Sequence, residues 1–373
     1  MYEVTFELET ITPLFMSGAD RDNVELRPSA FKGMMRFWWR AVRADANTKK
    51  LWEKESTLFG AAEEEFGKSK VQVILDYDRE VFGKFVRKIS GLRSILSNYN
   101  GTKYLLYSVL LSQNRCFLDT GFRFRLILRS QDCSSLQGAV AALWCVVNLG
   151  GIGARARRGG GNLTVINVFP REIVEFDFQI KGGIDKILDW FQQNVKKIKR
   201  TIDAQGSHQS YSSLSAAQLF LFDSAPTWEA ALNNIGHSFL QFRNRRSPDY
   251  HSVKNYLQHG TRPSTIEKAE FGLPILYQYR SLQGKRAVIE GSDSEKQRSA
   301  SSLIFKALKT VEGSFYPMIL HITKQQILAK RDRIRIRDIS RGSRQQAVTV
   351  VPSNSQIVDK FLSSLKPTGR LAL

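Results

Sequence analysis

A glycine- and arginine-rich stretch, LGGIGARARRGGGN, occupies residues 149–162 and constrains the fold more than any other part of the chain. Its six glycines permit backbone conformations that other residues disfavour and let a second backbone approach closely. Arg155, Arg157 and Arg158 stand among them without an acidic neighbour, and a guanidinium fork matches phosphate oxygens. The preceding run LQGAVAALWCVVNL suits a buried helix and the following run LTVINVF suits a strand. We therefore expect a loop held between two buried elements; the alternative is a solvated linker.

A second basic stretch, residues 27–46 (RPSAFKGMMRFWWRAVRADA), has the spacing of an amphipathic helix. Trp38 and Trp39 are adjacent and are not expected to face the core together, so one of them, assigned to Trp39, is expected at the surface where a base can stack. An ordinary solvated basic face is the alternative. The basic residues follow at steps of four, four and three, which aligns them on one stripe with no acid among them: Lys32, Arg36, Arg40 and Arg43.

Composition points to a globular protein with a polyanionic partner. The 373 residues are 42% hydrophobic, enough for one large domain or two ordinary ones. Lys and Arg number 55 against 35 Asp and Glu, a net charge of +20, which favours nucleic acid first and a membrane surface second. No apolar run has spanning length, and the start MYEVTFELET is unlike a signal peptide. Three cysteines at wide spacing form neither a metal pattern nor a disulfide framework, so an intracellular, cytoplasmic protein is expected: Cys116, Cys133 and Cys145.

The order of elements predicts the fold. Residues 2–169 read as strand, helix, strand, strand, helix, glycine-rich loop and strand, the order of a ferredoxin-like domain with insertions. This order places the first helix and the loop at one rim, where their arginines are expected to converge. After a polar linker at 201–213 a weaker copy follows, with a helix expected at 300–309 and polar loops at 249–262 and 282–294. The prediction is an α+β fold of two tandem ferredoxin-like (RRM-like, βαββαβ) domains with insertions, 1–200 and 201–373.

Two strands have arginines along one face. In GFRFRLILR (121–129) the apolar residues point one way, whereas Arg123 and Arg125 belong to an entirely basic face. In the stretch KRDRIRIRDISRGSR (330–344), alternate arginines share one face of a short strand, Arg333, Arg335 and Arg337. For this second strand, RNA contact and a basic edge that discourages aggregation are equally good interpretations.

Motifs of catalysis are weak. GIGARA (151–156) matches the dinucleotide pattern G-x-G-x-x-A, but a helix precedes it and a strand follows, the reverse of what that motif requires. No Walker loop occurs. The five histidines all lie at residue 208 or later without a metal-ligand spacing, and His208 and His251 remain candidates for the general base of a metal-independent ribonuclease. No cofactor and no metal are expected.

The stretches RPSAFKGMMRFWWRA and GGIGARARRGGG resemble the RAMP superfamily of CRISPR systems and, within it, the family of the first Cmr subunit of the type III-B (Cmr) RNA-guided effector complex. FGLPI (271–275) and RSASSLIFKAL (298–308) also resemble that family. The resemblance implies two packed ferredoxin-like domains and a non-catalytic, RNA-contacting role in antiviral defence. It implies CRISPR RNA or target single-stranded RNA and other Cmr subunits as partners, and no membrane. The alternative function is an endoribonuclease that matures guide RNA. Repeat-cleaving RAMP endonucleases usually have a histidine in the first domain, and its absence here disfavours that alternative.

The predicted RNA-binding residues come from two sources, the chemistry of the sequence and the family resemblance. The resemblance assigns phosphate contacts to three basic residues of the helix and three of the loop. The remaining candidates come from the basic stripe, the loop and the strand at 121–129. The complete set is Lys32, Arg36, Trp39, Arg40, Arg43, Arg123, Arg125, Gly153, Arg155, Arg157 and Arg158.

Overall fold

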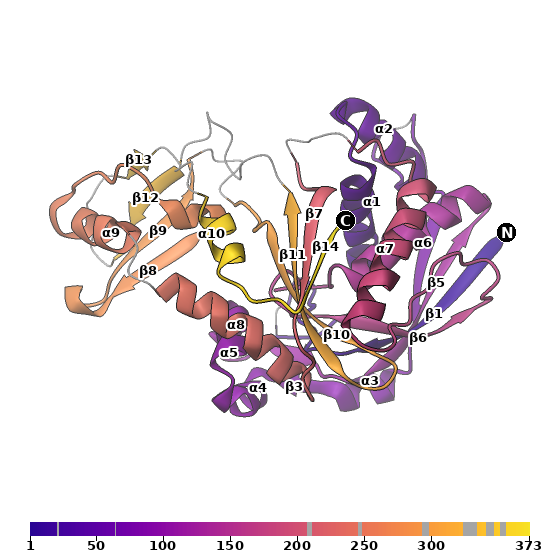
Figure 1. Cartoon of the computed structure of the whole chain (residues 1–373), viewed down its shortest axis with the longest axis horizontal. Helices are drawn as coiled ribbons and strands as arrows, with labels where there is room; N and C mark the ends of the chain where they lie inside the picture. The colour runs from indigo at the N-terminus through magenta and orange to yellow at the C-terminus, as the bar shows by residue number, and fades with distance from the viewer. Residues whose placement is uncertain are drawn as a thin grey trace. The chain divides into compact units, whose positions relative to one another are not determined.

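The structure is a computed structural model (Figure 1) that describes residues 1–20, 22–63, 65–206, 211–244, 248–292, 298–323, 334–340, 347–350 and 356–373. Packing divides the chain into two compact units. Unit 1 comprises Met1–His237, Ile304–Thr323 and Pro367–Leu373, and unit 2 comprises Ser238–Leu303 and Lys324–Lys366. The predicted boundary between residues 200 and 201 separates two ferredoxin-like domains, which need not coincide with these packing units, and it stays a prediction.

The first sheet of unit 1 has the strand order β2-β5-β1-β6, and all its pairs are antiparallel. Alternation places Val4, Phe6 and Leu8 fully inside, as the sequence predicts. The helices α1 and α6 pack against each other, and α6 also packs against the sheet (Figure 1). The elements are β1 (Tyr2–Thr10), α1 (Pro28–Arg43), β2 (Val71–Asp76), β5 (Arg123–Ser130), α6 (Cys133–Asn148) and β6 (Leu163–Phe169).

Inserted elements extend this first part of unit 1. Between β1 and β5 the chain adds short helices and the antiparallel pair β3 and β4. The segment 89–110 contains two helices in contact with each other. The inserted elements are α2 (Thr48–Phe59), α3 (Arg79–Phe85), β3 (Val86–Lys88), α4 (Ile89–Ile95), the 3-10 turn Leu96–Asn98, α5 (Asn100–Leu110) and β4 (Cys116–Leu118).

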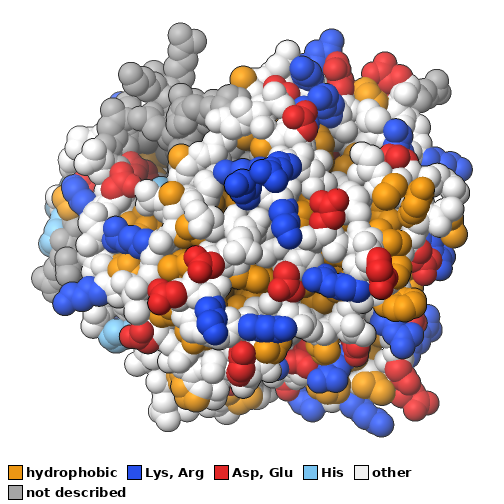
Figure 2. Space-filling view, turned by 45° about the vertical axis from the view of Figure 1, so that its right-hand side comes forward, with side chains coloured by type: hydrophobic (Ala, Val, Ile, Leu, Met, Phe, Trp, Pro, Cys, Tyr) orange, Lys and Arg blue, Asp and Glu red, His pale blue; other side chains and the backbone are white. Residues whose placement is uncertain are grey.

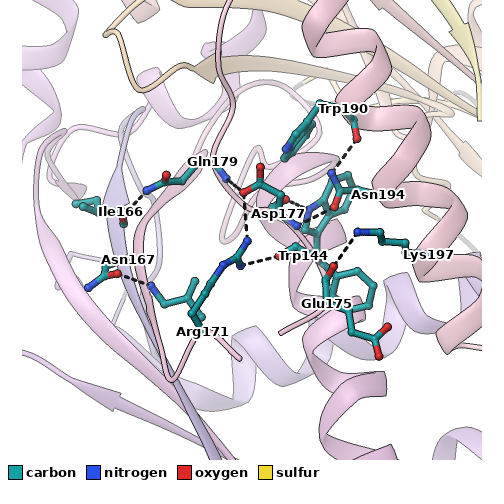
Figure 3. Close-up of polar contacts among 12 residues, drawn as sticks. Trp144, Ile166, Asn167, Arg171, Glu175, Asp177, Gln179, Trp190, Asn194 and Lys197 are labelled. Carbon is teal, nitrogen blue, oxygen red and sulfur yellow. Dashed lines mark hydrogen bonds and ion pairs between the residues drawn. The ribbon is translucent and has the colours of Figure 1, made fainter. Parts of the chain in front are cut away.

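Helix α7 (Ile184–Thr201) is fixed by the segment that precedes it (Figure 3). The backbone N–H of Asp177 donates to Asn194 Oδ1 at 2.8 Å, and Lys197 Nζ donates to the carbonyl oxygen of Glu175 at 3.2 Å. The buried apolar face of α7 packs against α6. These contacts fix the position of α7 in unit 1, and with it the positions of Lys196, Lys199 and Arg200 in its last turns.

The second sheet of unit 1 has the order β10-β11-β7-β14. Its edge strand β10 lies where the sequence analysis expects a helix, so that prediction is wrong. The run LIFKALK is buried at almost every position, and a short run buried on all sides has no period that distinguishes a strand from a helix. The elements are β7 (Ser213–Leu221), β10 (Leu303–Lys309), β11 (Phe315–Thr323) and β14 (Gly369–Ala372). Helix α8 (Trp228–Asn244) begins in unit 1 and ends in unit 2.

Unit 2 has its own sheet, in the order β13-β12-β9-β8, and its own core, which includes Tyr256, Ile289 and Ile336. Both predicted polar loops in this region are wrong, because α9 occupies the first and β9 the second. Most of their polar residues lie on the exposed face of an amphipathic element whose other face is buried. The elements are α9 (Pro248–His259), the 3-10 turns Glu267–Phe271 and Arg280–Leu282, β8 (Ile275–Tyr279), β9 (Lys285–Gly291), β12 (Ile334–Asp338), β13 (Val348–Val350) and α10 (Ile357–Ser363).

Candidate nucleic-acid interface

The glycine-rich loop 149–162 is held along its length by the segment after β1. The backbone N–H of Ala154 donates to the carbonyl oxygen of Phe15 at 2.8 Å, and that of Gly161 donates to Pro13 at 2.9 Å. The loop is closed on itself by a 2.9 Å bond from the N–H of Ile152 to the carbonyl of Gly161. The expectation of a loop fixed between buried elements is confirmed, and the alternative of a solvated linker is wrong.

Strand β10 holds the loop from the second sheet. The N–H of Phe305 donates to the carbonyl of Arg157 at 3.1 Å, and the N–H of Ala307 donates to Asn162 Oδ1 at 3.0 Å. Lys306 Nζ donates to the carbonyl of Gly150 at 2.9 Å. Lys306 is fully buried, and this burial lowers its pKa to about 7. The loop therefore connects the two sheets of unit 1.

At two positions of the loop a neighbouring group lies so close to the backbone that only glycine fits. A Cβ on Gly150 would lie 2.6 Å from Trp38 Nε1, so a side chain here would displace the buried indole of α1. Gly153, one of the predicted interface residues, is exposed and has a φ of 81°, and its Cβ would lie 2.6 Å from the carbonyl oxygen of Phe15. The backbone at both places can follow its path only without a side chain.

The three arginines of the loop are half-buried, and neighbouring groups hold their guanidiniums. Arg155 Nε donates to the carbonyl of Leu105 at 2.9 Å. The guanidinium of Arg157 lies 5.1 Å from the ring centre of Phe37 on α1, and that of Arg158 lies 5.0 Å from the ring centre of Phe305 on β10. Burial lowers the pKa of Arg157 to about 10, which leaves it charged at neutral pH. The charges are thus held in defined positions, which lowers the entropic cost of binding an anion.

The basic stripe of α1 is relieved by an acid, contrary to the prediction. Arg36 Nε donates to Glu55 Oε1, and Arg40 Nη1 lies 2.6 Å from both carboxylate oxygens of the same residue. Glu55 belongs to α2 and is only 1% exposed. Lys32 is half-buried, and burial together with the charge of Arg36 lowers its pKa. Two arginines therefore share one carboxylate, and together with Lys32 the stripe keeps an excess positive charge.

Replacing Glu55 with glutamine tests what this carboxylate does. We expect the free energy of unfolding to fall by about 1–3 kcal/mol, because two half-exposed guanidiniums lose a charged partner. Affinity for single-stranded RNA should rise in the folded variant, since one negative charge leaves the stripe. Urea unfolding and a salt titration of RNA binding measure both effects. Glu53→Gln, an exposed change on the same helix, is the matched control and should change neither; unchanged RNA binding by Glu55→Gln would mean that the stripe does not face RNA.

Trp39 and Arg43 have structural roles. Both indoles of α1 are buried, Trp38 at 0% and Trp39 at 6% exposure, so the prediction of an exposed stacking surface is wrong. Arg43 is 3% exposed; its guanidinium donates to the carbonyl of Ile202 at 2.8 Å and pairs with Asp203 at 3.2 Å. The reason is that α1 is covered on several sides, by α2, α6, α7 and β7. Trp39 and Arg43 are therefore not part of the proposed interface.

The basic face of β5 is balanced across the sheet. Arg123 pairs with Glu9 of β1 at 3.1 Å, and Arg125 pairs with Asp76 of β2 at 3.7 Å. Burial raises the pKa of Glu9, but Lys309 and Arg123 outweigh it and hold that pKa below its ordinary value. Opposite charges in cross-strand pairs stabilise a sheet without any ligand. The predicted RNA contacts of these two arginines remain predictions.

The remaining candidates lie in unit 2 or outside the described residues. Arg335 and Arg337 on β12 share Glu290, at 2.7 and 3.4 Å, whereas Arg333 lies outside the described residues. His251 lies on α9 with its ring edge-on to Tyr250, and His208 is also outside the described residues. Within the part of the chain that the structure describes, no group of three or more His, Cys, Asp or Glu residues is placed to hold a metal ion.

Charge on the visible surface is mixed. Figure 2 shows one face on which acidic and basic side chains are interspersed, with a group of basic side chains gathered near its middle. Among the described residues, none of the helices combines the length and the apolar character needed to span a membrane.

Several residues that build the interface carry weak sequence signals. Glu55 lies 15 and 19 residues from the arginines it pairs with, and no local pattern indicates this pairing. Phe37 and Phe305 support arginines by their ring faces. Lys306 had a usable signal, because a single charged residue inside an apolar run must either reach the surface or bind a buried acceptor.

Comparison with known proteins decides the family. A sequence model described as the RAMP superfamily matches residues 7–164. The CRISPR system Cmr subunit Cmr1-2 of Pyrococcus furiosus is 36% identical over 182 residues, which span 44% of this chain and 96% of that protein. The chain belongs to the Cmr1 family. The Cmr subunit Cmr1-1 of the same organism is 26% identical over 271 residues, 68% of this chain and 76% of that protein.

Solved structures show the same fold as this Cmr1-family chain. The crystal structure of apo Cmr1 from Pyrococcus furiosus superposes with a TM-score of 0.64 at 20% identity, covering 98% of this chain and 97% of that one. A chain in the cryo-EM structure of the type III-B Cmr-beta complex bound to cognate target RNA superposes with a TM-score of 0.54 at 13% identity, covering 86% and 96%. At these identities the likeness establishes the fold alone.

Proposed function

We propose that this Cmr1-family protein is a non-catalytic, RNA-binding subunit of a cytoplasmic type III-B Cmr ribonucleoprotein. Its partners are CRISPR RNA or target single-stranded RNA and other Cmr subunits, and its role is guide-directed recognition of foreign RNA. The observation that carries the proposal is the glycine-rich loop, which presents three packed arginines between two sheets. The net charge of +20 and the target-RNA complex of a structural relative support it.

Two tandem ferredoxin-like domains, 1–200 and 201–373, are part of the proposal. The strand orders β2-β5-β1-β6 and β10-β11-β7-β14 support it. In each sheet the first strand of the set lies between the third and the fourth, and the second strand lies at the edge. That arrangement follows from the βαββαβ order with inserted elements.

The proposed RNA path runs along the loop and α1. Phe37 of α1 lies against Arg157, which links the loop to the helix that carries the basic stripe. Contacts made through charge grip the sugar-phosphate backbone and carry no base information. We therefore expect binding that is tolerant of sequence and sensitive to salt. The proposed path consists of Lys32, Arg36, Arg40, Arg155, Arg157 and Arg158.

The test replaces Arg155, Arg157 and Arg158 together with glutamine. Affinity for unrelated single-stranded RNAs should fall about equally, and the slope of log affinity against log salt should become shallower by roughly two, as expected for three lost phosphate contacts. A salt titration monitored by fluorescence anisotropy measures this slope. The matched control replaces the same residues with lysine, which keeps the charges and should retain most of the slope.

Two results would contradict the proposal. An unchanged slope in a folded glutamine variant would make the loop a protein contact instead of an RNA contact. Cleavage of the labelled RNA by the wild type without metal, examined on a gel, would favour the endoribonuclease alternative. That alternative needs a general base near the phosphate-binding loop, and the sequence has no histidine before residue 208.

A further inference from the structure

Unit 1 contains a second basic site, in a cavity of about 530 Å³ beside the last turns of α7. A cavity of this size is within the usual range for a small organic ligand. Its walls come from α1, α7, the segment after α7, and the strands β7 and β14. Apolar side chains form much of the lining, among them Val42, Val195 and Leu373. A flat, weakly polar part of a ligand can lie against such a wall.

The charged lining of the cavity is unbalanced. Lys196, Lys199 and Arg200 all line it, and no ion pair of theirs is found among the described residues. Among the described residues of the lining, Asp203 alone is acidic, and it is already engaged by the buried Arg43 at 3.2 Å. Burial lowers the pKa of Lys199, as expected for an ammonium that is partly withdrawn from water without a carboxylate.

A hydroxyl group adds an independent observation. Ser215 of β7 lines the same cavity, and its Oγ is buried with no hydrogen-bond partner among the described residues. Buried hydroxyl groups are normally hydrogen-bonded. The electrostatic preference of a helix C-terminus for cations explains lysines in the last turn of α7, but it explains neither the cavity nor the unsatisfied hydroxyl.

We propose that this cavity binds a nucleotide unit, with its phosphate between Lys196, Lys199 and Arg200 and its sugar or base against the apolar wall and Ser215. The cationic side chains supply donors for phosphate oxygens, and the volume suits one nucleotide. The choice of a nucleotide over other anions rests on the proposed RNA-binding function. The unit is supplied either by a free mononucleotide or by the phosphorylated end of an RNA.

Binding of AMP to the full chain, measured by isothermal titration calorimetry, tests the free source. The double variant Lys196→Gln, Lys199→Gln should bind AMP at least about tenfold more weakly, because two phosphate ligands are lost. Lys197→Gln is the matched control: Lys197 is on the same helix but reaches the carbonyl of Glu175 (Figure 3) and does not line the cavity. It should bind AMP as the wild type does. Circular dichroism confirms that each variant is folded.

Short oligouridylates with and without a terminal phosphate, at either end, test the RNA source. A phosphorylated end should increase affinity for the wild type, and the increase should vanish in the double variant. The proposal is overturned if the wild type does not bind AMP and a terminal phosphate does not change its affinity for the oligouridylates. It is also overturned if the double variant binds AMP and the oligouridylates as tightly as the Lys197→Gln control does. If the glutamine variant of the loop loses RNA binding and the double variant of the cavity behaves as its control does, the proposed function holds and the cavity site is wrong. If the wild type binds AMP but not RNA, the cavity site holds and the proposed function is wrong.

Discussion

Replacing Gly161 with alanine should lower the free energy of unfolding by about 2–4 kcal/mol, a large effect for the addition of one methyl group. Gly161 has a φ of 61°, in the left-handed region, where a Cβ costs roughly 1–2 kcal/mol by itself. Its Cβ would also overlap the carbonyl oxygen of Ile152 and lie 2.9 Å from Leu14 Cδ1. Both neighbours are buried and cannot move freely. Urea denaturation followed by far-ultraviolet circular dichroism measures the loss.

Gly67 provides the control for backbone strain. It has a φ of 59°, almost the same as Gly161, but nothing lies within 4 Å of its Cβ position. Gly67→Ala should therefore cost only the roughly 1–2 kcal/mol of the left-handed conformation. Equal losses in the two variants would show that the loop at Gly161 is loosely packed, and the description of a loop tightly held between two sheets would then be wrong.

The same residues explain why the loop was recognisable from the sequence. Glycines are needed where a backbone passes close to another, as at Gly150 against Trp38. The flanking apolar runs are α6, which is buried almost throughout, and β6, which is buried at Leu163 and Val165 beside the loop. Alternation likewise predicts β1 and β5, because one face of each is buried and the other is charged.

The errors have a common cause in contacts between distant residues. The stripe of α1 is basic in the local sequence, but Glu55 reaches it from the next helix. Trp39 is buried because elements far along the chain, including β7, cover the side of α1 that a single helix would expose. The strand β10 is read as a helix because tertiary burial on all sides removes the period that local reasoning uses. In each case the missing information is which elements meet.

Lys306 should make the stability of the protein depend on pH. Its ammonium is fully buried and its pKa is lowered by burial to about 7, against about 10.4 in an unfolded chain. Between these values the unfolded chain binds the extra proton, so stability must rise with pH. Below pH 7 both states are protonated and the cost of the buried charge is complete. From pH 7 to 9 we expect this residue to add about 2–3 kcal/mol to the free energy of unfolding, at up to roughly 1.4 kcal/mol per pH unit.

The variant Lys306→Met isolates this contribution. Methionine keeps the length of the side chain and removes both the titration and the hydrogen bond to the carbonyl of Gly150, which Asn162 Nδ2 still approaches at 3.4 Å. The lost bond changes stability by about 1 kcal/mol at every pH. The difference between wild type and variant in urea denaturation should therefore increase from pH 7 to pH 9 in favour of the wild type. A difference that stays constant would mean that the ammonium reaches water, and that the loop is not anchored by a buried lysine.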